Sequence, residues 1–364
     1  MSRHRHQQSY DRPVKRVRRD STIVIALPDD LLNVILRHAI FKTNLTTSSV
    51  DYFKLYSFLS KFFRISKRFQ TLVHLLSPSL TFPPTPDSTG RFAYVTLLMR
   101  GDSYLPGALV TAFSLRQSNF DRICMVTPDV STEAKNLLHL VYTSVVDIKY
   151  IYEPKIPTTK WKRFAAHYNH WLSFCLTKLR LFELHQYSKL IFLDIDTLCL
   201  DVRAMDDLFT VPTPAGTLTL PPGSTIPHNT LISYRDLNYS CNKFYGISGA
   251  LMLLRPSLRE LASLGKYANS FNFNTRDNAG PDECLLSRYY GSNWRHLSTR
   301  FNAVPWKSAP DQALIHYVTH PPWSIKEYWE DYELWFEEAR KLTRDFPMCE
   351  QVFEKCLEIS RKAK

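Results

Sequence analysis

The stretch Phe192-Leu193-Asp194-Ile195-Asp196-Thr197-Leu198 is the most informative part of this sequence. The apolar run 190–193, which leads into it, predicts a buried strand. Asp194 and Asp196 lie two residues apart, so alternation along a strand points both carboxylates the same way. Two carboxylates at the end of a buried strand suit a hard divalent cation, and ligands of open α/β sheets bind at that end. An Asp-rich turn without a metal is the alternative interpretation.

Outward from this stretch, short apolar runs alternate with longer amphipathic ones from Arg91 onward. This alternation predicts an α/β protein with a mostly parallel sheet and helices on both faces. A Pro- and Thr-rich segment, 210–230, is expected to be a long loop. The expected strands are 92–99, 122–126, 145–150, 190–193 and 244–254, and the expected helices are 105–117, 132–141 and 172–185.

The composition is that of a globular protein, with 364 residues of which 44% are hydrophobic. The formal net charge is +12, but residues 1–20 hold seven basic residues against two acidic ones and so supply five of these charges. The rest of the chain is only mildly basic, and we therefore expect no specific nucleic-acid binding. Seven scattered cysteines without a Cys-x-x-Cys pair indicate neither a disulfide framework nor a zinc site.

The N-terminal region predicts separate small elements. Residues 1–20 are expected to be disordered, and 13–19 suit either a nuclear import signal or a solubilising tail. Residues 21–77 predict a helical module whose opening, Leu27-Pro28-Asp29-Asp30-Leu31-Leu32, resembles an F-box and implies a Skp1-like adaptor as partner. A helical hairpin packed on the main domain is the alternative. The Pro-rich segment 78–90 is expected to be a linker.

Nothing in the sequence predicts a membrane span or a signal peptide. A spanning helix needs about 18 or more consecutive apolar residues, and the chain has no such run. The N-terminal apolar run 23–27 is too short for a signal-peptide core. We therefore expect a cytoplasmic or nuclear location.

Several short motifs follow one another in order between residues 91 and 325. They are Val95-Thr96-Leu97, Tyr104, Gly107-Ala108-Leu109, Leu176-Thr177-Lys178-Leu179, Asp194-Ile195-Asp196-Thr197-Leu198, Ser248-Gly249, Asp282-Glu283, His316-Tyr317 and Pro322-Trp323. This ordered set resembles glycosyltransferase family 8, the group that includes glycogenin. The opening of the region also resembles the glycosyltransferase-like proteins of baculoviruses and related insect viruses, which suggests a viral origin.

The resemblance implies a GT-A domain over 91–325, followed by a helical C-terminal extension over 326–364. It implies a retaining, metal-dependent transferase that moves a hexose from a UDP-sugar to an unknown acceptor, with Mn²⁺ or another divalent cation as cofactor. Asp194, Asp196 and His316 would hold the metal, and Asp282 and Lys178 would act at the reacting centre. The implied donor-binding residues are Thr96, Leu97, Tyr104, Lys178, Asp194, Ile195, Asp196, Ser248, Gly249 and Glu283.

Several positions depart from the family pattern. The segment after His316 lacks the usual Gly and Lys that hold a diphosphate, and His320 or Lys326 are the candidates to replace them. Ile247 replaces the usual Asn, Glu283 replaces a Gln, and Asp277 is two residues out of step with the family's sugar-contacting Asp. These departures leave open a second interpretation, in which a degenerate transferase domain serves as a binding module beside an F-box-like adaptor.

Overall fold

The computed structural model describes residues 91–156, 172–219, 226–243, 246–273, 280–306, 311–318 and 320–362. The predicted basic tail, the F-box-like module and the linker all lie outside these residues. Their interpretation, including the Skp1-like partner, therefore stays a prediction.

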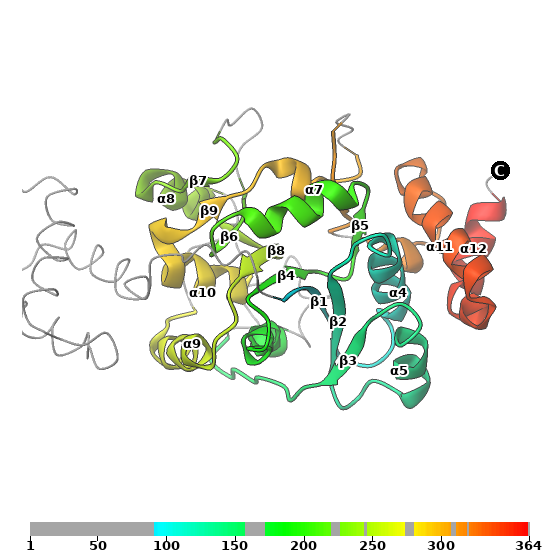
Figure 1. The fold of residues 1–364 in the computed structure, drawn as a ribbon, viewed down its shortest axis with the longest axis horizontal. Coiled ribbons are helices and arrows are strands. Elements are labelled where there is room, and N and C mark those ends of the chain that lie inside the picture. Colours follow the sequence, from blue (N-terminus) through cyan, green and yellow to red (C-terminus); the bar gives the residue numbers. More distant parts are fainter. Residues whose placement is uncertain are drawn as a thin grey trace, which may run out of the picture. The chain divides into compact units, whose positions relative to one another are not determined.

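Eight strands of the described chain form one mixed sheet in the order β3-β2-β1-β4-β8-β6-β9-β7 (Figure 1). The neighbours β3, β2, β1 and β4 all pair in parallel, as the alternating pattern predicts. The bounds are β1 Phe92–Leu98, β2 Asp121–Val126, β3 Ser144–Asp147, β4 Lys189–Leu193, β6 Ala215–Leu218, β7 Thr230–Leu231, β8 Ile247–Leu254 and β9 Arg295–His296.

The half of the sheet beyond β4 is mostly antiparallel. β8 runs antiparallel to both β4 and β6. Every residue of β8 is buried, and a strand buried on both faces has an apolar run that does not encode its direction. The expectation of one long loop over 210–230 is wrong in part, because Ala215–Leu218 forms β6. Its sequence, Ala-Gly-Thr-Leu, lacks the apolar alternation that predicts a strand.

Helices cover both faces of the sheet. On one face, α4 (Leu105–Ser114) and α5 (Thr132–Leu138) share an apolar core with α11 (Glu333–Asp345) and α12 (Glu350–Lys362), and Figure 1 shows the last two helices beside α4. The other face packs against η2 (Leu172–Glu183), α9 (Leu258–Ser270) and α10 (Pro281–Tyr290). The remaining helices are α7 (Val202–Asp207), α8 (Tyr234–Lys243), η3 (Leu208–Thr210), η4 (Gly291–Asn293), η5 (Thr299–Asn302), η6 (Pro322–Ser324), η7 (Glu330–Tyr332) and η8 (Pro347–Cys349).

The segment η2 is a 3₁₀ helix that is buried along most of its length. In a 3₁₀ helix, residues three apart lie on one face. Lys178 shares a face with the buried residues Leu172, Cys175 and Leu181, and the neighbouring face with Leu176, Leu179 and Phe182 is buried as well. The sequence pattern predicts a helix over nearly these residues, and the structure confirms it, ending two residues earlier. Lys178 is thereby carried into the interior with its apolar neighbours.

A second, two-stranded sheet stands beside the main one. It pairs β5 (Thr197–Cys199) with β10 (Leu314–His316) in antiparallel register. Since β5 begins directly after the Asp-Ile-Asp stretch, this small sheet joins the end of β4 to a segment more than a hundred residues further along the chain.

Candidate active site

The register of the small sheet places a histidine against the two aspartates. His316 pairs with Thr197 in the β5–β10 ladder. The next residue, Tyr317, donates its backbone N–H to the carbonyl oxygen of Asp196 at 2.9 Å. His316 itself donates its N–H to the Ala303 carbonyl at 2.7 Å. Backbone pairing on both sides therefore sets where the imidazole stands.

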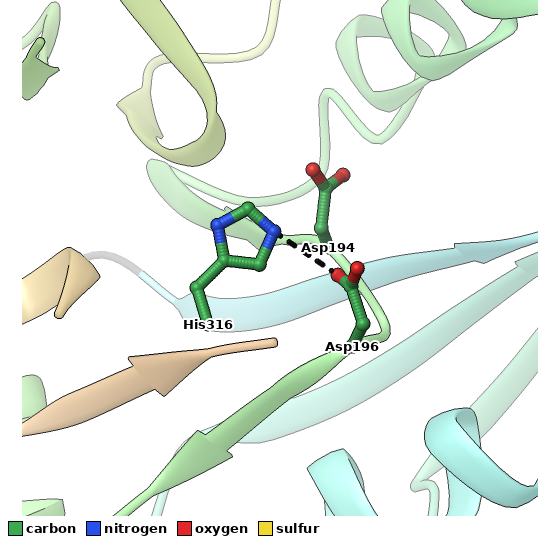
Figure 2. Close-up of side chains that lie close together, drawn as sticks. All are labelled: Asp194, Asp196 and His316. Atoms are coloured by element: carbon green, nitrogen blue, oxygen red, sulfur yellow. Dashed lines mark ion pairs between the residues drawn. The ribbon is translucent and has the colours of Figure 1, made fainter. Parts of the chain in front are cut away.

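Asp194, Asp196 and His316 form a three-residue cluster (Figure 2). One ligand atom from each residue lies within 4.8 Å of the others. His316 Nε2 is 3.3 Å from Asp196 Oδ1, and their side chains are 10% and 19% exposed. Figure 2 shows the imidazole approaching from β10 and the carboxylates from the turn between β4 and β5. One nitrogen and two carboxylates so arranged suit a transition metal such as Mn²⁺ or another divalent cation.

The electrostatics of the cluster indicate an excess of negative charge. Burial and the neighbouring Asp196 carboxylate raise the pKa of Asp194, although Lys178 opposes the change. Burial alone would lower the pKa of His316, but the carboxylates of Asp196, Asp194 and Glu283 together outweigh it, and the pKa is raised. Both shifts show that the site favours additional positive charge.

The turn that carries Asp194 and Asp196 packs against α4 and accepts hydrogen bonds from it. Thr111 donates its hydroxyl to the carbonyl oxygens of Ile195 at 3.1 Å and Thr197 at 2.8 Å. A Cβ at Gly107 would lie 2.5 Å from the Ile195 carbonyl and 2.3 Å from the Trp323 ring. The turn therefore rests directly on a glycine of α4, which has room for no side chain.

Lys178 connects the cluster of Asp194, Asp196 and His316 to α10. Its Nζ lies 2.7 Å from Asp282 Oδ2 and 3.6 Å from Asp194 Oδ1. The Lys178 and Asp282 side chains are 11% and 6% exposed. Although burial alone would lower the pKa of Lys178, the carboxylates of Asp194 and Asp282 raise it, so the ammonium stays charged. Asp282 lies in the first turn of α10, and its carboxylate contacts the site through Lys178.

Glu283 holds the backbone on the same side of the site. Its Oε1 accepts the N–H of Gly249 at 3.0 Å, and its Oε2 accepts the N–H of Gly280 at 3.1 Å. Burial, and next the charge of Asp282, raise the pKa of Glu283 to about 7. A Cβ at Gly249 would lie 2.9 Å from both Asp282 Oδ2 and Lys178 Nζ. β8 thus passes close to the ion pair at a residue without a side chain.

One further residue of the site, Asn302, was not predicted from the sequence. The Asn302 amide lies 3.0 Å from His316 Nδ1 and 3.2 Å from Ser248 Oγ. Ser248 precedes Gly249, so the contacts run from His316 through Asn302 to the Glu283 side of the site. Asn302 directly precedes Ala303, which forms a β-bridge with Ile315. The sequence does not reveal this bridge, so it gave no signal for the contact with His316.

With this geometry established, comparison with known proteins identifies the chain. The family model described as "Glycosyl transferase family 8" matches residues 95–325, which hold all of the clustered side chains above.

This chain belongs to glycosyl transferase family 8.

The family is one of glycosyltransferases, and the match covers most of the expected transferase domain over 91–325. Uncharacterized protein R707 of Acanthamoeba polyphaga mimivirus is 32% identical over 216 residues, covering 58% of this chain and 71% of that protein. Glycogenin of Komagataella phaffii is 33% identical over 265 residues, covering 64% and 58%. The chain spans only 27% of the length of Neurospora crassa glycogenin, over 220 residues of 27% identity.

Solved structures similar to this glycosyltransferase include the galactosyltransferase LgtC in complex with donor and acceptor sugar analogues. It covers 69% of this chain and 96% of its own, with 15% identity and a TM-score of 0.48. Within the described residues of the glycosyltransferase, no helix combines the length and apolar character that a bilayer span requires. One relative is viral, but it comes from an amoebal virus, so the suggested origin stays a prediction.

The remaining residues that the family resemblance assigns to the sugar donor are Thr96, Leu97 and Tyr104. The Thr96 hydroxyl is buried against the Tyr142 hydroxyl at 2.8 Å, which leaves its backbone as the group able to meet a ligand. Leu97 is buried, and the β1–β4 pairing stops at Val95, before either residue. The Tyr104 ring is 37% exposed and stands edge-on to Trp323 at 5.4 Å.

The candidates for the missing diphosphate contacts are not brought together with the metal cluster. The His320 ring packs edge-on against Trp329 at 5.3 Å. Lys326 is exposed, one residue beyond the buried Ile325. Asp277 lies outside the described residues. The role of His320 and Lys326 as replacements for the family's Gly and Lys therefore stays a prediction.

Proposed function

We propose that this glycosyltransferase is a retaining, metal-dependent enzyme that moves a hexose from a UDP-sugar to an acceptor. The observation that carries the proposal is the convergence of Asp194, Asp196 and His316 within 4.8 Å, beside the Lys178–Asp282 pair. The UDP-sugar and the retention of anomeric configuration rest on the family resemblance.

The cluster fits a divalent cation in both its chemistry and its charge. Carboxylate oxygens and an imidazole nitrogen together suit Mn²⁺ better than Mg²⁺, which takes oxygen ligands. Burial and the Asp196 carboxylate raise the pKa of Asp194, and a bound cation would favour the ionised form of both carboxylates. When bound, such an ion supplies Lewis-acid stabilisation of the departing diphosphate.

Lys178 and Asp282 are proposed to act where the sugar is transferred. The buried ammonium of Lys178 lies 3.6 Å from Asp194, so it can add a second positive charge beside the diphosphate oxygens. Its ion pair orients Asp282, whose carboxylate is positioned to stabilise positive charge that develops on the anomeric carbon. The backbone clamp made by Glu283 keeps Gly249 and the start of α10 in place around this pair.

The proposal is tested by UDP release from a panel of UDP-sugars, in Mn²⁺ and in chelator. We expect release with one or a few donors in Mn²⁺, and none in chelator. Asp194→Asn and Asp196→Asn should each lower release at least about 100-fold, because metal stabilisation is worth several kcal/mol. The matched control is Asp345→Asn, which changes an exposed aspartate at the end of α11 and should leave release unchanged.

Two outcomes would contradict the proposal. Release that persists in chelator, or in the two site variants, would remove the metal from the reaction. Absence of both UDP release and UDP binding in the wild-type chain would show that the fold is kept without the chemistry, as in the binding-module interpretation.

A further inference from the structure

A single side-chain amide joins the histidine of the metal cluster to the strands on the other side of the site. Asn302 Oδ1 lies 3.0 Å from His316 Nδ1. Asn302 Nδ2 lies 3.1 Å from Thr217 Oγ1 and 3.2 Å from Ser248 Oγ. Thr217, Ser248 and His316 are all buried and come from β6, β8 and β10, so the amide is fixed from three strands.

These contacts orient the amide. An amide nitrogen carries two hydrogens, and here each has a hydroxyl oxygen to accept it. The carbonyl oxygen is then the atom that faces the imidazole, and it can only accept a hydrogen bond. In this orientation, which gives both amide hydrogens an acceptor, His316 Nδ1 is the donor. In the neutral ring this leaves the lone pair on Nε2, which is the nitrogen that faces Asp196 at 3.3 Å.

We propose that Asn302 is a positioning residue that fixes His316 in the Nδ1–H form, with the Nε2 lone pair directed at the metal cluster. The inference rests on the metal site of the proposed function. Backbone pairing supports the proposal. The backbone N–H of Ala303 donates to the Leu314 carbonyl at 3.0 Å, and the backbone N–H of His316 donates to the Ala303 carbonyl at 2.7 Å. Asn302 is thus held in register with the residue that it orients. Partners of this kind on a ligating histidine typically change metal affinity 10- to 100-fold when removed.

The first test is the tautomer of His316 in the wild-type chain. The full-length protein is labelled with ¹⁵N-histidine, saturated with Zn²⁺ as a diamagnetic divalent cation, and studied by long-range ¹H–¹⁵N NMR. His316→Gln identifies the resonance. We expect the proton on Nδ1. A proton on Nε2 would overturn the inference without reference to any variant of Asn302.

The second test separates the acceptor from the donors of the amide. Asn302→Asp keeps an oxygen acceptor beside Nδ1 but loses the two hydrogen bonds that the amide donates. Asn302→Leu loses the acceptor as well as the two donated hydrogen bonds. Mn²⁺ binding in the absence of a nucleotide sugar, followed by electron paramagnetic resonance, should weaken about 10- to 100-fold in Asn302→Leu. It should stay within a few-fold of wild type in Asn302→Asp. Equal weakening in both variants, or none in Asn302→Leu, would overturn the inference.

The outcomes distinguish this inference from the proposed function. If the wild-type chain binds no Mn²⁺, the proposed function fails, and the NMR measurement still decides the tautomer. If the wild-type and Asn302→Leu chains bind Mn²⁺ equally well, the metal site stands and the role of Asn302 fails. Circular dichroism checks the fold of each variant, and if Asn302→Leu does not fold, the wild-type tautomer alone decides.

Discussion

The two sides of the candidate site balance their charges in different ways. On the β8 and α10 side, Lys178 pairs with Asp282 at 2.7 Å inside the protein, so the charges compensate each other without a ligand. On the β5 and β10 side, two carboxylates face one imidazole, and burial together with Asp196 raises the pKa of Asp194. This difference fits the proposed function, in which the β5 and β10 side takes an added cation and the β8 and α10 side does not.

The largest expected effect breaks the self-compensated side. Lys178→Met leaves the buried Asp282 without its cation and should lower the free energy of unfolding by about 3–5 kcal/mol. Asp194→Asn should be neutral or stabilising in chelator, because an acid whose folded pKa is raised costs stability once it is ionised. Urea unfolding of both variants in chelator measures the contrast. Equal destabilisation of the two would show that the sides do not differ.

A second prediction concerns the support under the metal side. Gly107→Ala places a methyl group 2.5 Å from the Ile195 carbonyl and 2.3 Å from Trp323. Overpacking of this kind costs about 1–3 kcal/mol and should displace the Asp-Ile-Asp turn, which weakens Mn²⁺ binding. The measurements are the unfolding free energy and the Mn²⁺ affinity.

The matched control is Gly265→Ala in α9, where an added Cβ would meet nothing within 4 Å. It should raise stability by about 0.5–1 kcal/mol through helix propensity and leave Mn²⁺ affinity unchanged. If Gly107→Ala behaves like this control, α4 does not support the turn.

A further prediction is a pH dependence on the β8 and α10 side. Burial and Asp282 raise the pKa of Glu283 from its ordinary 4.5 to about 7. Between these values the folded chain holds a proton that the unfolded chain has lost, so stability should fall as pH rises from 4.5 to about 7. The slope for one group is at most about 1.4 kcal/mol per pH unit.

Comparison of the wild type with Glu283→Gln in chelator isolates this contribution. The variant should lose this part of the slope, and it should lose about 1 kcal/mol overall, because an amide can accept only one of the two backbone hydrogen bonds. An unchanged slope in Glu283→Gln would assign the pH dependence to other groups.

The metal side was predictable because its main part is local in sequence. Asp194 and Asp196 follow the end of an apolar run and lie two residues apart, which already places them near each other. Strand alternation is not the reason, because both residues lie in the turn between β4 and β5. The position of His316 after Ala313-Leu314-Ile315 also indicates a strand end, and the family resemblance assigns it to the same site. The structure confirms that the three residues converge.

The supporting contacts were not predictable, because they depend on packing between distant segments. The Lys178–Asp282 pair joins η2 to α10, and Asn302 reaches His316 only because a bridge from Ala303 to Ile315 sets the register. Thr111 and Gly107 belong to a helix whose pattern predicts burial but not the turn that it carries. The direction of β8 was likewise hidden, since a strand buried on both faces has the same pattern either way.

The proposed function requires that Asp194, Asp196 and His316 hold one divalent cation. Manganese anomalous scattering from crystals of the wild-type chain grown with Mn²⁺ can locate this cation. We expect the strongest anomalous peak between the two carboxylates and His316 Nε2. A map with no peak there, or with its strongest peak at other residues, would show that these three residues do not hold the cation.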